Sequence, residues 1–207
     1  MQGLYLVTPD WDDTAKLLEH TGAALHAGAA MVQYRHKGAS PALRREQAAA
    51  LKALCRRYNR PLVINDHIDL CLTVDADGVH VGGTDASVAQ ARALLGPLKI
   101  VGASCYGQLP LALAAERDGA SYVAFGGFYP SRVKQYSFRT EPALVAEAKA
   151  AVGVPVVVIG GMTPDNAAPL VSLGADMVAA ISSVYAAPVP GAEVRRFDAL
   201  FAARAKQ

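Results

Sequence analysis

An excess of charge of one sign is what this sequence most plainly lacks. Its 20 lysine and arginine residues nearly balance 18 acidic residues, which leaves a net charge of +2. A nucleic-acid-binding domain typically carries a strong basic excess, so we expect no nucleic-acid partner. Charged residues make up only 18% of the chain and hydrophobic residues 52%, which excludes the polar composition of a disordered protein.

Cysteines, a secretory signal and long apolar runs are also scarce or absent. Cys55, Cys71 and Cys105 cannot all pair and none stands in a C-x-x-C motif, so we interpret them as reduced thiols. The first residues lack the basic stretch, apolar core and cleavage site of a signal peptide. No apolar run approaches the roughly 20 residues that a membrane helix requires. We therefore expect a cytoplasmic protein with no membrane partner, and the sequence leaves open whether it forms a homo-oligomer.

Short apolar runs rich in β-branched residues recur along the chain, separated by longer alanine-rich segments. Most of the runs are apolar throughout, which is typical of parallel strands covered on both faces. We expect strands at Leu4–Thr8, Met31–Arg35, Leu62–Asn65, Gly78–Val81, Ile100–Ser104, Tyr122–Gly126, Val156–Ile159 and Met177–Ala180. We expect helices at Thr14–Ala27, Pro41–Tyr58, Asp66–Val74, Val88–Leu95, Leu109–Asp118, Glu141–Val152, Pro164–Leu173 and Glu193–Ala205.

This alternation predicts an α/β protein, a single (β/α)8 TIM barrel over residues 1–207. An open doubly wound sheet is the alternative, but the first turn has no glycine-rich motif. No linker or composition shift divides the chain. The longest gap, residues 127–140, follows the sixth strand, and a gap of this length in a compact domain is typical of a functional lid loop.

Polar residues gather where chemistry lies in such barrels, at the carboxyl ends of the strands. Gln33, Arg35 and Lys37 alternate at the end of the second strand, so we expect them to share a face that points into the barrel mouth. Tyr34 and His36 should point away from it. A layer of ion pairs inside the barrel is the alternative, but a phosphate ligand would supply the partners that these side chains need.

Two carboxylates, Asp66 and Asp85, lie at the ends of neighbouring strands. Such a pair suits Mg²⁺, which takes one or two protein carboxylates and completes its coordination with water and substrate phosphate. Asp66 has an equally good alternative role as the N-cap of the short helix that follows, which Asn65 could also fill.

A second anion site is indicated after the last two strands. Gly160 and Gly161 follow the seventh strand, and Ser182 and Ser183 follow the eighth. Loops in these positions form the usual phosphate cradle of (β/α)8 barrels, in which backbone N–H groups bind the dianion.

The predicted lid loop is basic, with Arg132, Lys134 and Arg139 and no acidic residue. A solvated basic loop is one interpretation, and a lid that closes over an anion is the one we favour. Two anion sites at one barrel mouth indicate group transfer between a diphosphate and a phosphate-bearing acceptor.

The ordered motifs of the chain resemble those of the thiamine-phosphate synthase family over nearly its whole length. The residues that carry the resemblance are L-Y-L-V-T at 4–8, V-Q-Y-R-H-K at 32–37, V-I-N-D-H-I-D-L at 63–70, A-D-G-V-H-V-G-G-T-D at 76–85, V-G-A-S at 101–104, V-I-G-G-M at 158–162 and A-A-I-S-S at 179–183. The resemblance implies a barrel that joins 4-amino-5-hydroxymethyl-2-methylpyrimidine diphosphate to 4-methyl-5-(2-hydroxyethyl)thiazole phosphate. The products would be thiamine phosphate and pyrophosphate, and Mg²⁺ would be the cofactor.

The resemblance also implies a role for each site residue. Gln33 and Ser104 would contact the pyrimidine, and the diphosphate would be held by Arg35, Lys37, Asn65 and Lys134. Mg²⁺ would be bound by Asp66 and Asp85. The thiazole phosphate would be held by Gly161, Ile181 and Ser182, with Ser131 as a hydroxyl contact from the lid. The catalytic residues would be Arg35, Lys37, Ser104 and Lys134.

The family's mechanism is dissociative, and the absence of a Ser-His-Asp or Cys-His arrangement agrees with it. His36 replaces the family's usual acid, and Val133 replaces a hydroxyl residue of the lid. Two alternatives stay open. A related thiazole tautomerase has a histidine after the fifth strand, where this chain has Cys105, and a non-catalytic phosphate-binding regulator would not need the full set of polar residues.

Overall fold

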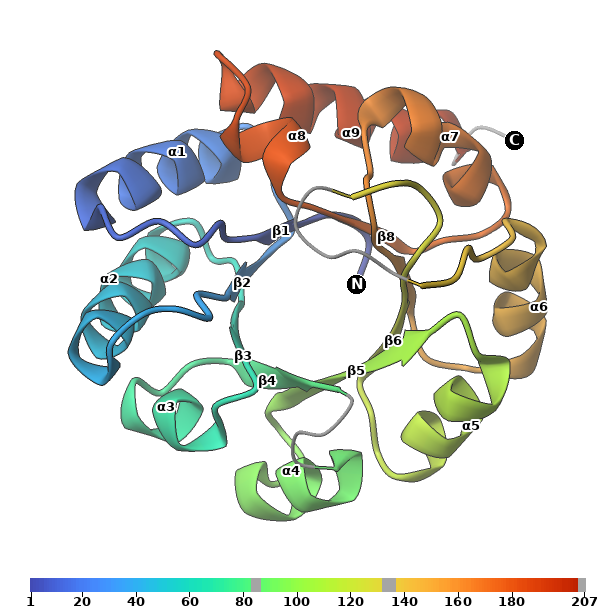
Figure 1. The fold of residues 1–207 in the computed structure, drawn as a ribbon, viewed down its shortest axis with the longest axis horizontal. Helices are drawn as coiled ribbons and strands as arrows, with labels where there is room; N and C mark the ends of the chain where they lie inside the picture. Colours follow the sequence, from blue (N-terminus) through green and yellow to red (C-terminus); the bar gives the residue numbers. More distant parts are fainter. Residues whose placement is uncertain (83–86, 132–136, 205–207) are drawn as a thin grey trace.

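Eight parallel strands close into a barrel in the computed structural model, which describes residues 1–82, 87–131 and 137–204 (Figure 1). Each strand pairs with its neighbours in the sequence, and β1 pairs with β8 to close the ring. The strands are β1 Gly3–Val7, β2 Met31–Tyr34, β3 Leu62–Asn65, β4 Gly78–Val81, β5 Ile100–Tyr106, β6 Tyr122–Phe125, β7 Val156–Val158 and β8 Met177–Ala180. The predicted (β/α)8 fold is therefore confirmed.

The helices form an outer ring around the strands (Figure 1). They are α1 Thr14–His26, α2 Pro41–Arg57, α3 Ile68–Thr73, α4 Val88–Leu95, α5 Leu109–Arg117, α6 Ala143–Ala151, α7 Pro164–Ser172, α8 Ser182–Tyr185 and α9 Pro190–Arg204. Ser40 and Thr163 cap α2 and α7 with their hydroxyls, and a proline follows each, as the sequence predicts. Among the described residues, none of these helices is long and apolar enough to cross a membrane.

Several helix boundaries differ from the prediction, and α6 begins at Ala143 rather than at Glu141. The short helix α8 was missed, and α9 begins at Pro190 rather than at Glu193. α3 begins at Ile68 and its N-cap is His67, so the interpretation of Asp66 or Asn65 as the cap is wrong. Asp66 has a φ of 64°, a left-handed conformation that is not that of an N-cap residue.

The strands separate two apolar layers because successive side chains alternate between their faces. Side chains such as Leu4, Leu6 and Ile64 point outward and pack beneath the helices. The opposite set fills the barrel interior and consists of Tyr5, Val7, Met31, Val63, Tyr122, Ala124, Val157, Met177 and Ala179. Burial on both faces explains why the strands are apolar at nearly every position.

The three cysteines are buried and unpaired, as predicted. Burial raises the pKa of the Cys55 thiol to about 12 and that of the Cys71 thiol to about 11. These side chains therefore pack as protonated apolar groups.

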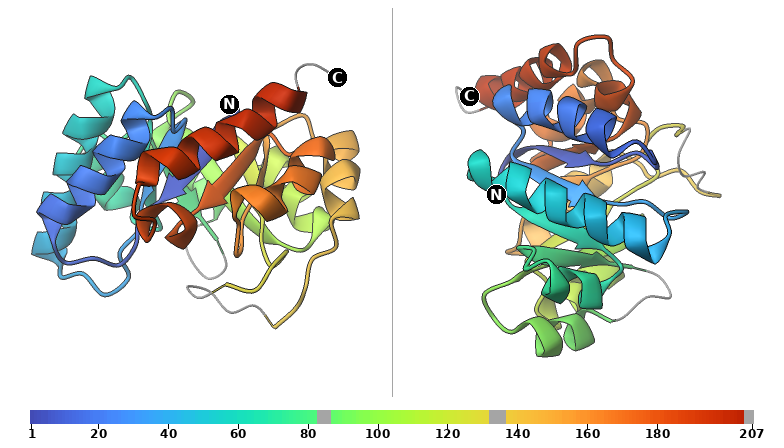
Figure 2. Two further views of the ribbon diagram at one scale, coloured as in Figure 1. Left: turned by 90° about the horizontal axis from the view of Figure 1, so that it is seen from above. Right: turned by 90° about the vertical axis from the view of Figure 1, so that its left-hand side faces the viewer.

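The amino end of the barrel holds groups that tie strands together. Asp176 precedes β8, and its Oδ2 accepts hydrogen bonds from the Val156 backbone N–H at 2.7 Å and from Lys149 Nζ at 2.8 Å. Figure 2 shows the N-terminus at this end, opposite the long segment between β6 and α6. Asp176 thus links the start of β8 to β7 and α6.

We expect Asp176→Ala to lower the free energy of unfolding by about 1–3 kcal/mol, because the buried Val156 N–H loses its acceptor. Urea denaturation measures the change. Glu147→Ala, at an exposed position of α6, is the control and should change stability by less than about 0.5 kcal/mol. An unchanged free energy of unfolding in Asp176→Ala would contradict the structural role of this carboxylate.

Candidate active site

A cavity of about 420 Å³ lies inside the barrel at the carboxyl ends of the strands. Every strand contributes an inward-pointing residue to its wall, so the closed ring builds it. Most of the site residues predicted from the sequence lie on this wall, namely Gln33, Arg35, Asn65, Ser104, Ser131, Gly161, Ile181 and Ser182. Lys37 and Asp66 are close in sequence to the lining residues Arg35 and Asn65. Asp85 and Lys134 fall outside the described residues.

Arg35 is held in place by the loop that follows β1. Its backbone N–H donates to Thr8 Oγ1 at 2.8 Å, and Thr8 Oγ1 donates to the Arg35 carbonyl at 2.9 Å. Its Nη1 lies 3.2 Å from Asp10 Oδ1, which also accepts a hydrogen bond from the Lys37 backbone N–H at 3.2 Å. Asp10 therefore orients the Arg35 side chain and holds the backbone at Lys37, a role that the sequence analysis missed.

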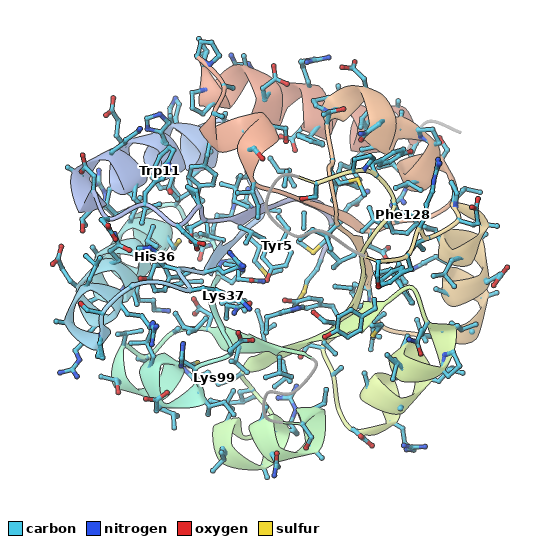
Figure 3. The ribbon with its side chains drawn as sticks, in the orientation of Figure 1. Tyr5, Trp11, His36, Lys37, Lys99 and Phe128 are labelled. Atoms are coloured by element: carbon cyan, nitrogen blue, oxygen red, sulfur yellow. The ribbon has the colours of Figure 1, made fainter. Side chains whose placement is uncertain are left out.

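The residues that alternate with Gln33 and Arg35 point away from the cavity, as the sequence predicts. Tyr34 points toward α2, where its hydroxyl donates to Gln47 Oε1 at 3.0 Å. His36 is buried with its Nε2 3.5 Å from Asp12 Oδ1. Figure 3 labels His36 on the α2 side of the strand ring and Lys37 at the rim of the opening.

Asp66 follows β3 and lies next to the cavity residue Asn65. Its backbone N–H donates to the His80 carbonyl at 2.9 Å, which fixes the turn that gives Asp66 its positive φ. Asn65 Nδ2 donates to Asp66 Oδ2 at 2.5 Å. Within the described ranges no group of three or more histidine, cysteine or acidic side chains could hold a metal ion.

The glycines after β7 pack directly against the segment that follows β6. A Cβ at Gly161, which has a φ of 63°, would lie 2.2 Å from the Pro130 carbonyl oxygen. A Cβ at Gly160 would lie 2.9 Å from the Gly127 backbone nitrogen. Only glycine fits both the backbone conformation and the close approach at these two positions.

Hydrogen bonds join the same two segments to the start of α7. Tyr129 donates from its hydroxyl to the Asn166 carbonyl at 2.8 Å, and Asn166 Nδ2 donates to the Gly161 carbonyl at 2.9 Å. The Thr140 N–H donates to the Gly127 carbonyl at 2.9 Å, which brings the two ends of the 127–140 segment together. The wall formed by Pro130, Ser131 and Gly161 is thus fixed from both sides.

Two serines complete this wall at the start of α8. The first backbone N–H groups of any helix, here those of Ser182 and Ser183, have no acceptor within the helix. Ser183 Oγ is buried and has no hydrogen-bond partner among the described residues. A buried hydroxyl of this kind is costly unless a ligand or water pairs with it.

A chain of five hydrogen-bonded side chains crosses the floor of the cavity. Gln33 Nε2 donates to the Tyr5 hydroxyl at 2.6 Å, and the Tyr5 and Tyr122 hydroxyls lie 2.7 Å apart. The Tyr122 hydroxyl lies 2.9 Å from His80 Nδ1, and His80 Nε2 lies 2.9 Å from Ser104 Oγ. Burial raises the pKa of both tyrosines well above the ordinary value, so both hydroxyls keep their protons.

The sequence analysis found the two ends of this chain, Gln33 and Ser104, but not its middle. Tyr5 and Tyr122 stand within apolar strand runs, where tyrosine is common for packing reasons alone. Figure 3 shows Tyr5 inside the ring of strands. The sequence did contain a signal for them, because Tyr5, Tyr122 and His80 all occupy strand positions that point into the barrel.

Fold and cavity define the class of protein: a (β/α)8 barrel with a polar cavity at the carboxyl ends of its strands, where enzymes of this fold carry their active sites. Residues 4–184 match the family described as thiamine monophosphate synthase. The thiamine-phosphate synthase of Janthinobacterium sp. (strain Marseille) is 65% identical over 202 residues, 98% of each chain. That of Thiobacillus denitrificans is 48% identical over 205 residues, 99% of this chain and 97% of the relative.

A solved structure agrees with these relatives. The thiamine phosphate pyrophosphorylase from Pyrococcus furiosus has a TM-score of 0.86 and 31% identity, with 98% of this chain and 96% of that chain covered. The chain belongs to the thiamine monophosphate synthase family. It is an enzyme of thiamine biosynthesis, a transferase that makes thiamine phosphate, which decides against the isomerase and the regulator considered above.

We expect Gly161→Ala to raise KM for the phosphate-bearing acceptor at least about tenfold, because the new Cβ must displace Pro130 or the loop after β7. Steady-state kinetics with each substrate varied in turn measures the effect. Gly38→Ala is the matched control, since a Cβ at Gly38 meets nothing within 4 Å. An unchanged KM for the acceptor in Gly161→Ala would contradict the importance of this close approach.

Proposed function

We propose that the cavity joins 4-amino-5-hydroxymethyl-2-methylpyrimidine diphosphate to 4-methyl-5-(2-hydroxyethyl)thiazole phosphate, with thiamine phosphate and pyrophosphate as products. The observation that carries the proposal is that two different anion environments share one 420 Å³ cavity. Cationic side chains follow β2, and backbone N–H groups with serine hydroxyls follow β7 and β8. Two small molecules that carry phosphate groups are thus the substrates.

The diphosphate is assigned to the wall that begins at β2. Arg35 can bind phosphate oxygens with two N–H groups at once, and its contact with Asp10 orients it before substrate binds. Lys37 and Asn65 lie beside it, and Lys134 is assigned to the same group from the lid. The 127–140 segment acts in this proposal as a lid on a single catalytic domain that spans residues 1–207.

Mg²⁺ is assigned to Asp66 and Asp85, and the surroundings of Asp66 fit this ion. Asp66 is a carboxylate at a strand end, held by a backbone hydrogen bond to the His80 carbonyl and by the Asn65 amide. One or two carboxylates beside a phosphate-binding wall are what Mg²⁺ requires. When bound, Mg²⁺ supplies positive charge that stabilises the leaving diphosphate.

The thiazole phosphate is assigned to Gly161, Ile181 and Ser182, with Ser131 as a further hydroxyl contact. The unpartnered Ser183 Oγ supports this assignment, because a phosphate oxygen would accept its hydrogen bond. A neutral cradle of N–H and O–H donors binds a dianion without a competing cation. Each substrate thereby has a distinct place, and the cavity holds the two rings between them.

The reaction then needs charge stabilisation and exclusion of water more than a protein nucleophile. The bond between the pyrimidine methylene carbon and the diphosphate oxygen breaks, and its electron pair leaves with pyrophosphate. Arg35, Lys37 and Lys134 stabilise that charge, while Gln33 and Ser104 hold the ring. The thiazole nitrogen then donates its electron pair to the methylene carbon and forms the new bond.

Apolar residues of the cavity protect the cationic methylene from water. Val157, Ile159 and Ala179 line the same cavity as the two anion sites. Water in that space would capture the methylene and give the pyrimidine alcohol instead of thiamine phosphate. A cytoplasmic location stays a prediction, and the oligomeric state stays open.

The test of the proposed function is incubation of the purified protein with both substrates and Mg²⁺, followed by identification of the product by mass. We expect thiamine phosphate, with one pyrophosphate released for each product molecule. Omission of either substrate should abolish the product, and a chelator should abolish it reversibly. Product formation that is indifferent to chelator would overturn the assignment of Mg²⁺.

We expect Asp66→Asn to lower kcat between about tenfold and a thousandfold. One unit of attraction at about 4 Å and an effective dielectric constant of about 20 is about 4 kcal/mol, and solvent and other ligands reduce it. Pyrophosphate release measured against Mg²⁺ concentration should show partial recovery at high Mg²⁺. Asp69→Asn, an exposed neighbour on α3, is the control. Unchanged Mg²⁺ dependence in Asp66→Asn would rule out Asp66 as a ligand.

A further inference from the structure

The hydrogen-bonded chain on the cavity floor has a fixed direction. Each tyrosine hydroxyl has one proton, so it donates to one neighbour and accepts from the other. Because Gln33 Nε2 donates to Tyr5, the Tyr5 hydroxyl donates to Tyr122, and Tyr122 donates to His80 Nδ1. His80 then carries its proton on Nε2 and donates it to Ser104 Oγ.

This direction decides what the two ends offer to a ligand. The Gln33 amide donates one of its two N–H groups to Tyr5, which leaves Oε1 and the second N–H for a ligand. Ser104 accepts from His80 at its oxygen, so its own proton is the group that it donates. The direction of the chain thus makes the Ser104 hydroxyl at β5 a donor to a ligand, while the Gln33 amide at β2 can both accept and donate.

Packing alone does not explain why two tyrosines occupy the middle of this hydrogen-bonded chain. Tyr5 and Tyr122 are 1% and 0% exposed, and a buried hydroxyl is costly unless it is hydrogen-bonded. Gly102 on β5 provides the space, because a Cβ there would lie 2.0 Å from Tyr122 Cζ and 2.2 Å from its hydroxyl. Phenylalanine at both positions would fill nearly the same volume without polar groups to satisfy.

We propose that Tyr5, Tyr122 and His80 are positioning residues that select the 4-amino form of the pyrimidine over a 4-oxo form. This inference rests on the proposed function. An aminopyrimidine donates from its amino group and accepts at the adjacent ring nitrogen. The 4-oxo form presents the reverse pattern, with a carbonyl acceptor beside a ring N–H donor. The Ser104 donor matches the acceptor at the ring nitrogen of the 4-amino form and opposes the ring N–H of the 4-oxo form, while Gln33 Oε1 can accept from the amino group.

The test compares two pyrimidine diphosphates, the 4-amino substrate and its 4-oxo analogue, in Tyr122→Phe. The measured quantity is the inhibition constant of the oxo analogue divided by KM of the amino substrate. The variant interrupts the chain, so His80 can change its tautomer and the Ser104 hydroxyl can then accept from a ligand. We expect this ratio to fall about tenfold, the value of one neutral hydrogen bond, while KM for the thiazole phosphate stays unchanged.

Two further variants separate positioning from packing. Tyr5→Phe interrupts the chain at a second point and should lower the ratio in the same direction, which covers the case that Tyr122→Phe does not fold. Tyr34→Phe removes another buried tyrosine hydroxyl, bonded to Gln47 on the outer face of β2, and should leave the ratio unchanged.

Three results would overturn the inference: an unchanged ratio in an active Tyr122→Phe or Tyr5→Phe variant, an equal change in Tyr34→Phe, or a parent enzyme that does not discriminate between the two pyrimidines. Failure of the parent to make thiamine phosphate would instead reject the proposed function itself.

Discussion

The hydrogen bonds between β1 and β8 close the barrel, and the site depends on this closure more than on any other interaction. Gly3 to Leu6 pair with Met177 to Ala180, which places the β2 wall and the β7–β8 wall on either side of β1. In an open sheet the first and last strands would be its two edges, and Arg35 and Gly161 would face different solvent regions. Closure also encloses an apolar interior, in which Tyr5 of β1 reaches Tyr122 of β6.

The interior of the barrel is apolar, and this property determines how its few polar groups must be arranged. A buried hydroxyl or imidazole must find a partner, so the polar residues of the floor join into one chain instead of binding independently. The cationic residues Arg35 and Lys37 lie at the rim of the cavity. Asp10 orients Arg35 there, in a position that a phosphate group can reach. In the proposed function, the cationic residues lie where the diphosphate leaves, and the neutral hydrogen bonds lie where the pyrimidine ring binds.

Strand positions and glycine positions were predictable from the sequence because both follow from local rules. Alternation placed Gln33 and Arg35 on the cavity wall, and the order of strands placed Gly161 beside Ser182. The N-cap interpretation of Asp66 was wrong because a left-handed residue delays α3 until Ile68, and no composition signal marks that turn. Asp10 and the tyrosine pair were missed because their partners, Arg35 and His80, are 25 and 42 positions away and meet only after closure. The roles of Lys134 and Asp85 stay predictions, because both lie outside the described residues.

The central claim is that the two anions occupy opposite walls of one cavity, and a crystal structure with thiamine phosphate, Mg²⁺ and pyrophosphate bound tests it most directly. The account predicts pyrophosphate within hydrogen-bond distance of Arg35 and Asn65, with the metal ion on Asp66. It predicts the phosphate of thiamine phosphate on the Gly161 and Ser182 backbone N–H groups, with Ser183 Oγ now paired. Pyrophosphate in the cradle after β7 and β8, or the product phosphate on Arg35, would contradict the account.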